Sequence, residues 1–600
     1  MSRNNQDRRR NESTDPRKRL LEQENGYYLK KWTGRLPVAL LYPNHYQVGM
    51  SSLGFQLVYR LLNENEGIVC ERLFLPDPGR KIVSLESGRR PEDFTIIFCS
   101  ISFEHDFVNL AAFLLAAGLE PLACNRPKRI APGTPLVVCG GVAAFMNPEP
   151  LAPFVDLFVI GEAEPLLPPL LSALASHGLD DRTSLLARLN RQHHGFYAPR
   201  FYEPLYDGEA TFTGYKVEKG FPRRIKKVIL QKTDTAAHSE LLTPETEFAE
   251  LYLTELGRGC SRGCRFCAAG FIYRPHRLWD REAILRGLDD RPDRTKRVGL
   301  LGMEMTDNET LEAIAGRISR DHCSLSFSSL RADRISAGVL SLLSQSGLKS
   351  VAIAPDGASE RLRRVINKGL EAADLISAAR RLVQAGLAKL KIYLMIGLPT
   401  ETEEDLLEFL DLVEKIQSVI KPLGQQRGHL CELSISVNSF VPKPWTPFQY
   451  HPYGISAAMS GPGGEEAQFP GKLAVKNLRS KIALLKKGLS GMANTRVSFD
   501  NPDHVLFQAV LARGDRRLAA VLLNMAGSGI SWKQAMKEQD LSEAWYATRL
   551  YSAASALPWT IVDHSIKQSY LWKEYCKSFA ARITIPCDTV LCRRCGVCHD

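Results

Sequence analysis

Half of the fourteen cysteines in this 600-residue chain fall into two short groups whose spacing is suited to metal chemistry. Cys260, Cys264 and Cys267 form a Cys-x3-Cys-x2-Cys group directly after an apolar segment. Three thiolates on one loop can hold three irons of a cubane cluster and leave the fourth iron without a protein ligand. An open coordination position is typical of a catalytic metal site. Zinc is the alternative, and it would need a fourth ligand, for which His276 is the nearest candidate.

The second group closes the chain with the spacing Cys-x4-Cys-x2-Cys-x2-Cys, at Cys587, Cys592, Cys595 and Cys598. Four close thiolates can hold either a fully ligated iron–sulfur cluster or a zinc ion. The Cys-x2-Cys-x2-Cys run is typical of bacterial ferredoxin loops and favours a second 4Fe–4S cluster. Such a cluster would relay electrons, bind substrate or supply sulfur.

Composition is that of a globular protein, with 44% hydrophobic and 24% charged residues and a formal net charge of +11. No apolar run is long enough to cross a bilayer, and the Arg-rich start has no apolar core of a signal peptide. We therefore expect a cytoplasmic protein with no membrane partner. We expect residues 1–30 to form a disordered basic tail. Such a tail can contact RNA, so RNA stays a possible partner.

Alternating apolar strands and helical stretches position the cysteines in an α/β fold. Residues 31–205 predict a doubly wound, Rossmann-like domain, and residues 206–246 a linker. Six further strand–helix units predict a partial (β/α)6 barrel over 247–460, where chemistry would sit at the carboxyl ends of the strands. Residues 461–600 predict a mainly helical C-terminal domain that carries the second cysteine group.

The first cysteine group, with Phe266 before its third cysteine, resembles the motif of the radical S-adenosylmethionine (SAM) superfamily. In that family the amino and carboxylate groups of SAM chelate the open iron of a 4Fe–4S cluster. One electron then cleaves SAM to a 5′-deoxyadenosyl radical. The resemblance implies an enzyme, SAM as a cofactor, and a reductant partner such as ferredoxin or flavodoxin.

Three later segments resemble the SAM-binding parts of that family. In LGMEMTD, Gly302 and Met303 stand at the glycine positions, and Glu304 would accept a charge-assisted hydrogen bond from the SAM ammonium. In KIYLMIGLPTET, Gly397 would let the backbone approach the adenine. For Glu304 the alternative is a solvated loop carboxylate. The resemblance implies further contacts with the ribose and carboxylate of SAM, and the alternative for the arginines among them is an exposed helix face. The candidates are Ser329, Arg331, Asp356, Ser359, Arg361 and Arg364.

The segment 438–449, NSFVPKPWTPFQ, resembles one shared by methylthiotransferases and cobalamin-dependent radical SAM enzymes. Lys443 and Trp445 would then face the substrate. The alternative is a Pro-rich turn that Trp445 packs.

A Rossmann-like domain before the barrel resembles the cobalamin-binding radical SAM class, whose Asp-x-His-x-x-Gly motif supplies a cobalt ligand. Aligned on Gly49, residues 44–49 carry tyrosine at the histidine position. Aligned on His45, they carry valine at the glycine position. We expect a degenerate domain that has lost cobalamin, or one that binds it without the histidine, and we favour loss.

These features predict a radical SAM enzyme that modifies an unknown substrate. The basic tail and the methylthiotransferase-like segment favour a macromolecule, by methylation or sulfur insertion on RNA or protein. The alternatives are a small metabolite or lipid substrate, and a non-catalytic iron–sulfur or zinc scaffold that binds nucleic acid.

Overall fold

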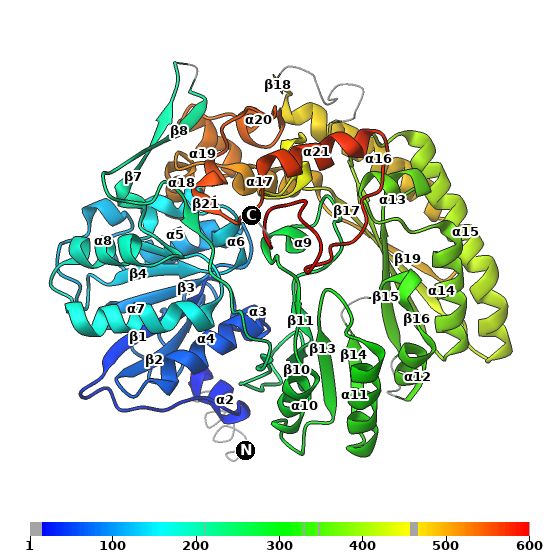
Figure 1. Cartoon of the computed structure of the whole chain (residues 1–600), viewed down its shortest axis with the longest axis horizontal. Coiled ribbons are helices and arrows are strands. Elements are labelled where there is room, and N and C mark those ends of the chain that lie inside the picture. Colours follow the sequence, from blue (N-terminus) through cyan, green and yellow to red (C-terminus); the bar gives the residue numbers. More distant parts are fainter. Residues whose placement is uncertain (1–14, 209, 328–329, 346–348, 456–465, 599–600) are drawn as a thin grey trace, which may run out of the picture.

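The computed structural model describes residues 15–598 except 209, 328–329, 346–348 and 456–465. Its N-terminal part is built on a six-stranded sheet in the order β2–β1–β3–β4–β5–β6, parallel except for β6 (Figure 1). The strands are β1 (Leu36–Tyr42), β2 (Ile68–Phe74), β3 (Ile96–Ser100), β4 (Leu136–Gly140), β5 (Leu157–Val159) and β6 (Phe196–Tyr197).

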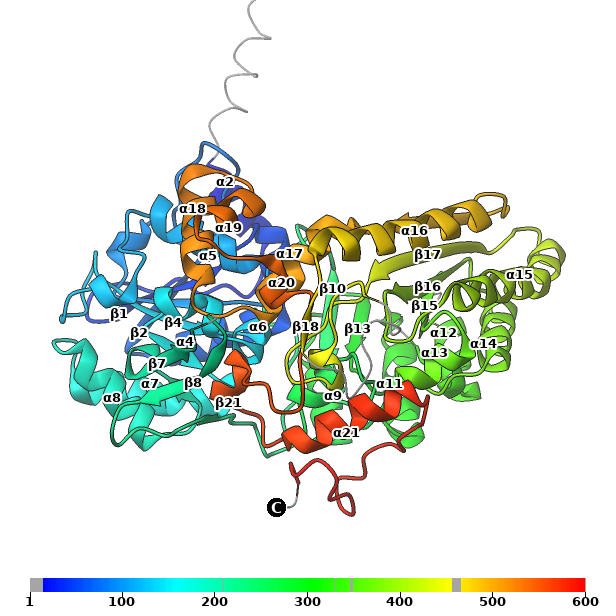
Figure 2. The ribbon, with the colours of Figure 1, turned by 90° about the horizontal axis from the view of Figure 1, so that it is seen from above.

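Helices cover both faces of this sheet. Three of them, α4 (Leu53–Glu64), α7 (Ala163–His177) and α8 (Arg182–Gln192), lie on one face, and α5 (Asp106–Ala116) lies on the other (Figure 2). The strands are almost wholly buried apolar runs, as a parallel sheet covered on both sides requires. The predicted doubly wound domain is confirmed, and β2 and β6 are strands that the sequence did not predict.

The segment after this domain carries short strands of its own. A hairpin of β7 (Tyr202–Tyr206) and β8 (Phe212–Val217) is followed by β9 (Ile225–Lys226), which pairs with β21 (Val562–Asp563) near the other end of the chain. The assignment of 206–246 as a linker stays a prediction.

Two parallel sheets follow, and a single parallel bridge between Leu330 and Ile353 joins them. The first holds β10 (Leu251–Glu255), β13 (Arg297–Leu301) and β14 (Ser324–Phe327). The second holds β15 (Ser350–Asp356), β16 (Lys389–Ile396), β17 (Glu432–Ser439) and β19 (Thr495–Phe499). The six predicted strands are all present, and the described strands form an open rather than a closed barrel. A seventh, β19, extends the sheet with residues that the sequence analysis assigned to a helical domain.

Amphipathic helices connect these parallel strands. The longest, α15 (Glu403–Gln426), begins at a capping box between Thr402 and Asp405 and buries one apolar stripe. Because all seven strands run parallel, their carboxyl ends lie at one edge, where loops can gather functional residues. The other connecting helices are α10 (Arg281–Asp289), α11 (Asn308–Arg320), α12 (Ala337–Gln345), α14 (Ala372–Gln384) and α16 (Gly471–Leu489).

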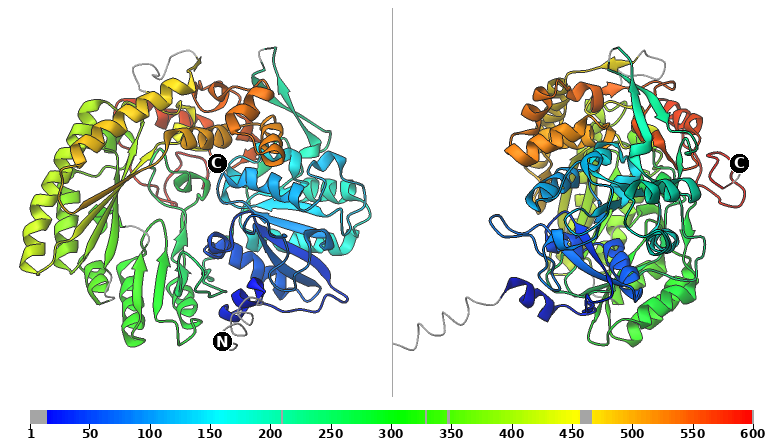
Figure 3. Two further views of the ribbon diagram at one scale, coloured as in Figure 1. Left: turned by 180° about the vertical axis from the view of Figure 1, so that it is seen from behind. Right: turned by 90° about the vertical axis from the view of Figure 1, so that its left-hand side faces the viewer.

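C-terminal helices lie across the tops of both α/β parts in the view of Figure 1 and are seen from behind in Figure 3. They are α17 (Pro502–Arg513), α18 (Leu518–Ser528), α19 (Trp532–Glu538), α20 (Glu543–Tyr546) and α21 (Gln568–Phe579). In the part of the chain that the structure describes, no helix is long and apolar enough to span a bilayer.

Candidate functional site

The first cysteine group lies on a loop that leaves the carboxyl end of β10. A short antiparallel pair, β11 (Gly257–Arg258) with β12 (Arg277–Leu278), closes this loop at its base, and α9 (Ala269–Ile272) lies within it. Gly259 has a φ of +85°, and a Cβ there would come within 2.8 Å of a backbone oxygen, so only glycine fits this turn. The chain therefore holds the cysteine loop against the end of the first barrel strand.

The three thiols of this loop interact electrostatically. Burial, together with the charges of Glu304, Cys264 and Cys267, raises the pKa of Cys260 to about 12. Burial likewise raises the pKa of Cys267 to about 11. A metal that binds these sulfurs must displace their protons, so binding would be coupled to proton release.

The three thiols of the loop are chemically suited to an iron–sulfur cluster. Among the described residues, no three Cys, His, Asp or Glu side chains converge as the ligands of one metal ion would. In a cubane each thiolate binds a different iron, so the sulfurs stand farther apart than around one ion. His276, the possible fourth zinc ligand, instead faces Glu304, with 3.4 Å between Nε2 and Oε2.

Glu304 lies where the sequence predicted, beside the cysteine loop. Its Oε2 accepts the backbone N–H of Ser261 and its Oε1 accepts the Ser261 hydroxyl, each at 2.8 Å. A carboxylate has about four acceptor positions, so these bonds leave capacity for a further cationic donor. Gly302 is packed close to this turn, because a Cβ there would lie 2.9 Å from the Glu304 carbonyl oxygen.

Two more predicted residues lie beside Cys264. Asp356, at the end of β15, forms an ion pair with Lys368, and the Arg331 guanidinium donates to the Lys368 carbonyl. Burial raises the pKa of Cys264, and the charges of Lys368 and Arg331 oppose that rise. Ser329 lies outside the described residues.

Other predicted SAM contacts have partners elsewhere. Ser359 is fully buried as the N-cap of α13 (Glu360–Val365), and its hydroxyl donates to Asp405. Arg361 pairs with the same carboxylate, and Arg364 pairs along the exposed helix with Glu360. These contacts fix the α13–α15 junction and do not support a SAM role for the three residues, which stays a prediction.

The structure gives Gly397 and the 438–449 segment packing roles. Gly397 has a φ of +82°, and a Cβ there would meet the Leu478 side chain of α16 at 2.8 Å. Trp445 is fully buried in its turn, which answers the open question in favour of packing. Lys443 forms an ion pair with Glu104, a residue that follows β3 in the N-terminal domain.

A cavity of about 490 Å³ lies between the N-terminal sheet and the barrel. One wall consists of residues at or after the carboxyl ends of β3, β4 and β5, including Ser100, Gly141 and Gly161. The other consists of residues at the ends of β10 and β13, including Glu255 and Gly302. The strand ends of both α/β parts therefore face one cavity, beside the base of the cysteine loop.

Charged side chains form a network in the cavity wall. Arg258 pairs with Glu164 at 2.8 Å, Glu255 at 3.1 Å and Glu162 at 3.3 Å. Burial would lower the pKa of Arg258, but the charges of Glu255 and Glu164 outweigh it and raise the pKa. Arg277 adds a second cation to Glu162, at 2.6 Å. The arrangement fixes carboxylates at the mouth of the loop and can orient a polar substrate.

The second cysteine group packs directly against the first loop. The Cys587 N–H donates to the Ser261 carbonyl at 2.7 Å, so the two groups meet through adjacent backbone. Burial, together with the neighbouring thiolates of Cys592, Cys595 and Cys598, raises the pKa of Cys587 to about 11. Burial opposes ionisation of Cys592 too, but hydrogen bonds from Arg594 outweigh it and lower the pKa of that thiol.

Arg265, inside the cysteine loop, anchors this contact. It is fully buried and donates to Glu574 of α21, to the carbonyl oxygens of Arg364 and Val365, and to the Arg582 carbonyl at 2.6 Å. One side chain therefore ties the loop to α13, to α21 and to the C-terminal segment.

Two family models match the parts that build this site. The model described as "Radical SAM proteins, N-terminal" matches residues 54–199, and the "Radical SAM superfamily" model matches residues 254–413. The second match contains the cysteine loop. The chain belongs to the radical SAM superfamily. Together the two matches cover about half of it.

A relative of this radical SAM protein is "Uncharacterized protein MJ0966" of Methanocaldococcus jannaschii, 27% identical over 81% of this chain and 90% of that protein. Similar solved structures include the radical SAM methyltransferase TsrM from Kitasatospora setae, bound to tryptophan substrate and a SAM analogue. Its TM-score is 0.48 at 13% identity, over 84% of this chain and 99% of that chain. The cobalamin-dependent radical SAM enzyme OxsB, bound to aqua-cobalamin, has a TM-score of 0.41 at 15% identity, over 63% and 52%. At TM-scores below 0.5 these likenesses carry no weight for function.

Sequence reasoning missed several residues of this radical SAM site. Arg258 gave no signal of its own, because its three acidic partners come from two domains. Arg265 did carry a signal, because it lies between Cys264 and Cys267, where a solvated side chain is not expected. Ser261 was not predicted to matter, although it contacts both Glu304 and the second cysteine group.

Proposed function

We propose that this radical SAM enzyme holds a 4Fe–4S cluster on Cys260, Cys264 and Cys267. The bound cluster would supply the electron that cleaves SAM into methionine and a 5′-deoxyadenosyl radical. Glu304 orients the loop through Ser261 and offers its remaining lone pairs to the SAM ammonium. We further propose a ferredoxin or flavodoxin as the electron donor.

The cavity at the cysteine loop carries this proposal, because it gives a radical a place to act. Its 490 Å³ lies within the roughly 300–1,000 Å³ of small-molecule pockets. It would admit a small substrate or one inserted residue of a macromolecule. We favour a macromolecular substrate, RNA or protein, modified by methylation or sulfur insertion. A small metabolite or lipid is the second candidate.

The test is the combined Cys260→Ala, Cys264→Ala and Cys267→Ala change in anaerobically reconstituted protein. We expect the wild type, with a strong reductant, to yield 5′-deoxyadenosine or a methyl-transfer product and the variant to yield none. Cys124→Ala, at an exposed thiol outside both groups, is the control. Turnover that persists in the triple variant would contradict the proposal.

We propose that the C-terminal cysteines hold a second 4Fe–4S cluster. Its support is the contact between Cys587 and Ser261, which puts one thiol set beside the other. In the triple variant about four irons with matching sulfide should remain. One zinc ion without sulfide would instead identify a structural zinc site.

We propose that the N-terminal domain has lost cobalamin, because the described residues of the inter-domain cavity offer no histidine ligand for cobalt. His45 is exposed at the start of α3 (Tyr46–Met50) and lines a different hollow from the cavity between the domains. Among the described residues that line the inter-domain cavity there is no histidine. Protein produced with abundant cobalamin should carry little of it after gel filtration, and a stoichiometric corrinoid spectrum would contradict this.

A further inference from the structure

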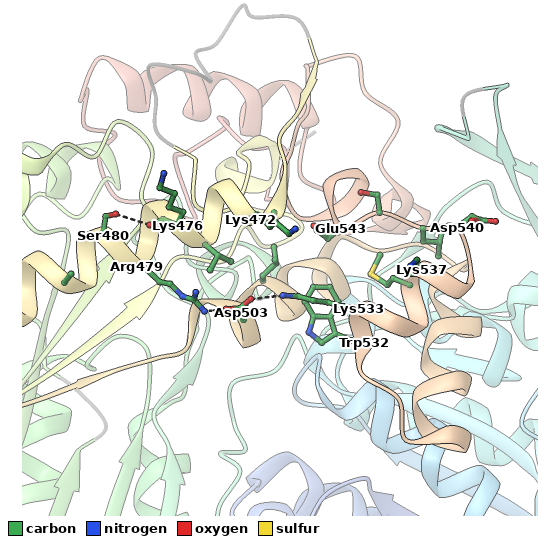
Figure 4. Close-up of a pocket in the computed structure, with 17 residues that line it drawn as sticks. Lys472, Lys476, Arg479, Ser480, Asp503, Trp532, Lys533, Lys537, Asp540 and Glu543 are labelled. Carbon is green, nitrogen blue, oxygen red and sulfur yellow. Dashed lines mark hydrogen bonds and ion pairs between the residues drawn. The ribbon is translucent and has the colours of Figure 1, made fainter.

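A groove on the outer side of α16 is rich in basic side chains. Its volume is about 930 Å³, and α16, the start of α17 and α19 line it. Figure 4 shows its cations on both sides, on α16 and on α19. They are Lys472, Lys476, Arg479, Lys533 and Lys537.

The sequence of α16 concentrates positive charge. Its 19 residues include six lysines and arginines and no aspartate or glutamate. The exposed cations Lys472, Lys476, Lys486 and Lys487 follow one side of the helix over about 22 Å, at about 1.5 Å per residue. The opposite side is buried, so this helix presents a charged stripe along its outer side.

Three lysines of the groove have no neutralising partner in the described chain. Asp503 pairs with both Arg479 and Lys533, as the dashed lines of Figure 4 mark. Two further carboxylates, Asp540 and Glu543, also line the groove. Lys472, Lys476 and Lys537 nevertheless form no ion pair with any described carboxylate. Like charges held close together destabilise a protein unless an anion joins them. The groove is therefore suited to a ligand with several negative charges.

The groove also contains an aromatic side chain, Trp532, which the binding of phosphate groups alone would not require. Its half-exposed indole lines the groove, stacked on Phe507 at a centroid distance of 5.1 Å. Lys533 lies over the ring, with its Nζ 5.3 Å from the centroid. An aromatic platform among cations is typical of surfaces that bind single-stranded nucleic acid, where bases stack and phosphates pair.

A membrane surface fits the same charge less well. None of the exposed large apolar side chains of the described chain lies in residues 471–541. A helix that binds a bilayer inserts an apolar face, and the apolar face of α16 is buried in the protein, with Leu478 against Gly397. The outer stripe is thus one helix diameter, about 10 Å, from the end of barrel strand β16.

We propose that this groove binds the phosphate backbone of RNA, with a base packing against the exposed part of the Trp532 indole. The inference rests on the proposed macromolecular substrate and narrows it to RNA. An RNA strand along α16 would lie outside the helix that packs on the carboxyl end of β16, in the same barrel whose strand β10 leads into the cysteine loop.

The test measures binding rather than turnover, so it is independent of the clusters. A labelled 20-nucleotide single-stranded RNA of mixed sequence is titrated with the full chain by fluorescence anisotropy. The variant combines Lys472→Glu, Lys476→Glu and Lys537→Glu. The control makes the same charge change at exposed Lys219, Lys232 and Lys421.

We expect the groove variant to bind RNA at least about tenfold more weakly than the control variant. Its salt dependence, the slope of log K against log salt, should fall by about 2, since three phosphate contacts are lost at roughly 0.7 each. Trp532→Ala should weaken binding with an unchanged salt slope. Equal weakening in the two triple variants, binding only to anionic vesicles, or no binding by the wild type would each overturn the inference. Failed SAM cleavage with intact RNA binding would instead refute the proposed chemistry alone.

Discussion

Replacing Glu574 by glutamine should loosen the C-terminal segment from the cysteine loop. Glu574 is almost fully buried, and it is the one carboxylate that Arg265 contacts among the described residues. The change keeps the size of the side chain but removes its charge. Arg265 would then stay buried without a counter-charge, because its other acceptors are neutral carbonyl oxygens.

Breaking a buried ion pair by removing one partner costs about 3–5 kcal/mol. We take the lower end, about 3 kcal/mol, because the carbonyl acceptors still solvate the guanidinium. At about 1.4 kcal/mol per factor of ten, local opening of the segment should become roughly a hundredfold more frequent. Glu574 also accepts from Lys577 at 2.7 Å, but that lysine is 41% exposed, so Lys577→Ala should cost under about 1 kcal/mol.

Hydrogen exchange read by mass spectrometry measures this opening in peptides that cover residues 568–598. Protection should fall in Glu574→Gln and remain close to wild type in Lys577→Ala. Burial would raise the pKa of Glu574, but the bonds from Lys577 and the charge of Arg265 outweigh it and lower the pKa. The contribution of Glu574 to the stability of the folded state is therefore present above the unfolded pKa of about 4.3. It is lost as the pH falls through the lower pKa of the folded state. Unchanged protection in Glu574→Gln, or an equal loss in both variants, would refute this reasoning.

Two further predictions concern single side chains. Glu304→Ala should weaken SAM binding by calorimetry, by roughly thirtyfold for one lost charge-assisted bond, and should also lower iron content, because Ser261 loses both of its bonds. Ser261→Ala, which keeps the backbone bond, should lower iron less, and normal iron and SAM affinity in Glu304→Ala would contradict the assignment. Burial lowers the pKa of His451 to about 3, so below pH 6.5 the unfolded chain binds a proton that the folded chain excludes. Stability should then fall by about 1.4 kcal/mol per pH unit towards pH 3, and urea midpoints should show a weaker acid dependence in His451→Gln.

The strands could be predicted because their signal is local. The barrel strands are either nearly continuous buried runs, as in β10, or alternate buried with partly exposed residues, as in β16 and β17, and both patterns are local. β19 was missed because TRVSF is short, alternates in burial as an edge strand, and follows a lysine-rich helix that suggested a helical domain. Its pairing with β17 depends on contacts more than fifty residues away.

Roles at the site were harder to predict, because distant residues decide them. Gly397 was expected to let the backbone approach the adenine, but Leu478 of α16 occupies the space beside it. Ser359 has the spacing of an N-cap, and Asp405 takes its hydroxyl. The contact between Cys587 and Ser261 joins residues more than three hundred positions apart, and no local pattern encodes it.

The ion pairs between the barrel and the N-terminal domain are best explained by positioning. Arg258 with Glu164, and Lys443 with Glu104, each join the barrel to the N-terminal domain at the strand ends. Buried pairs gain little net stability, because desolvation offsets most of their attraction. They do fix one relative placement, since any shift leaves a charge buried without its partner. A radical enzyme needs that precision, because a reactive carbon misplaced by about 1 Å loses much of its rate.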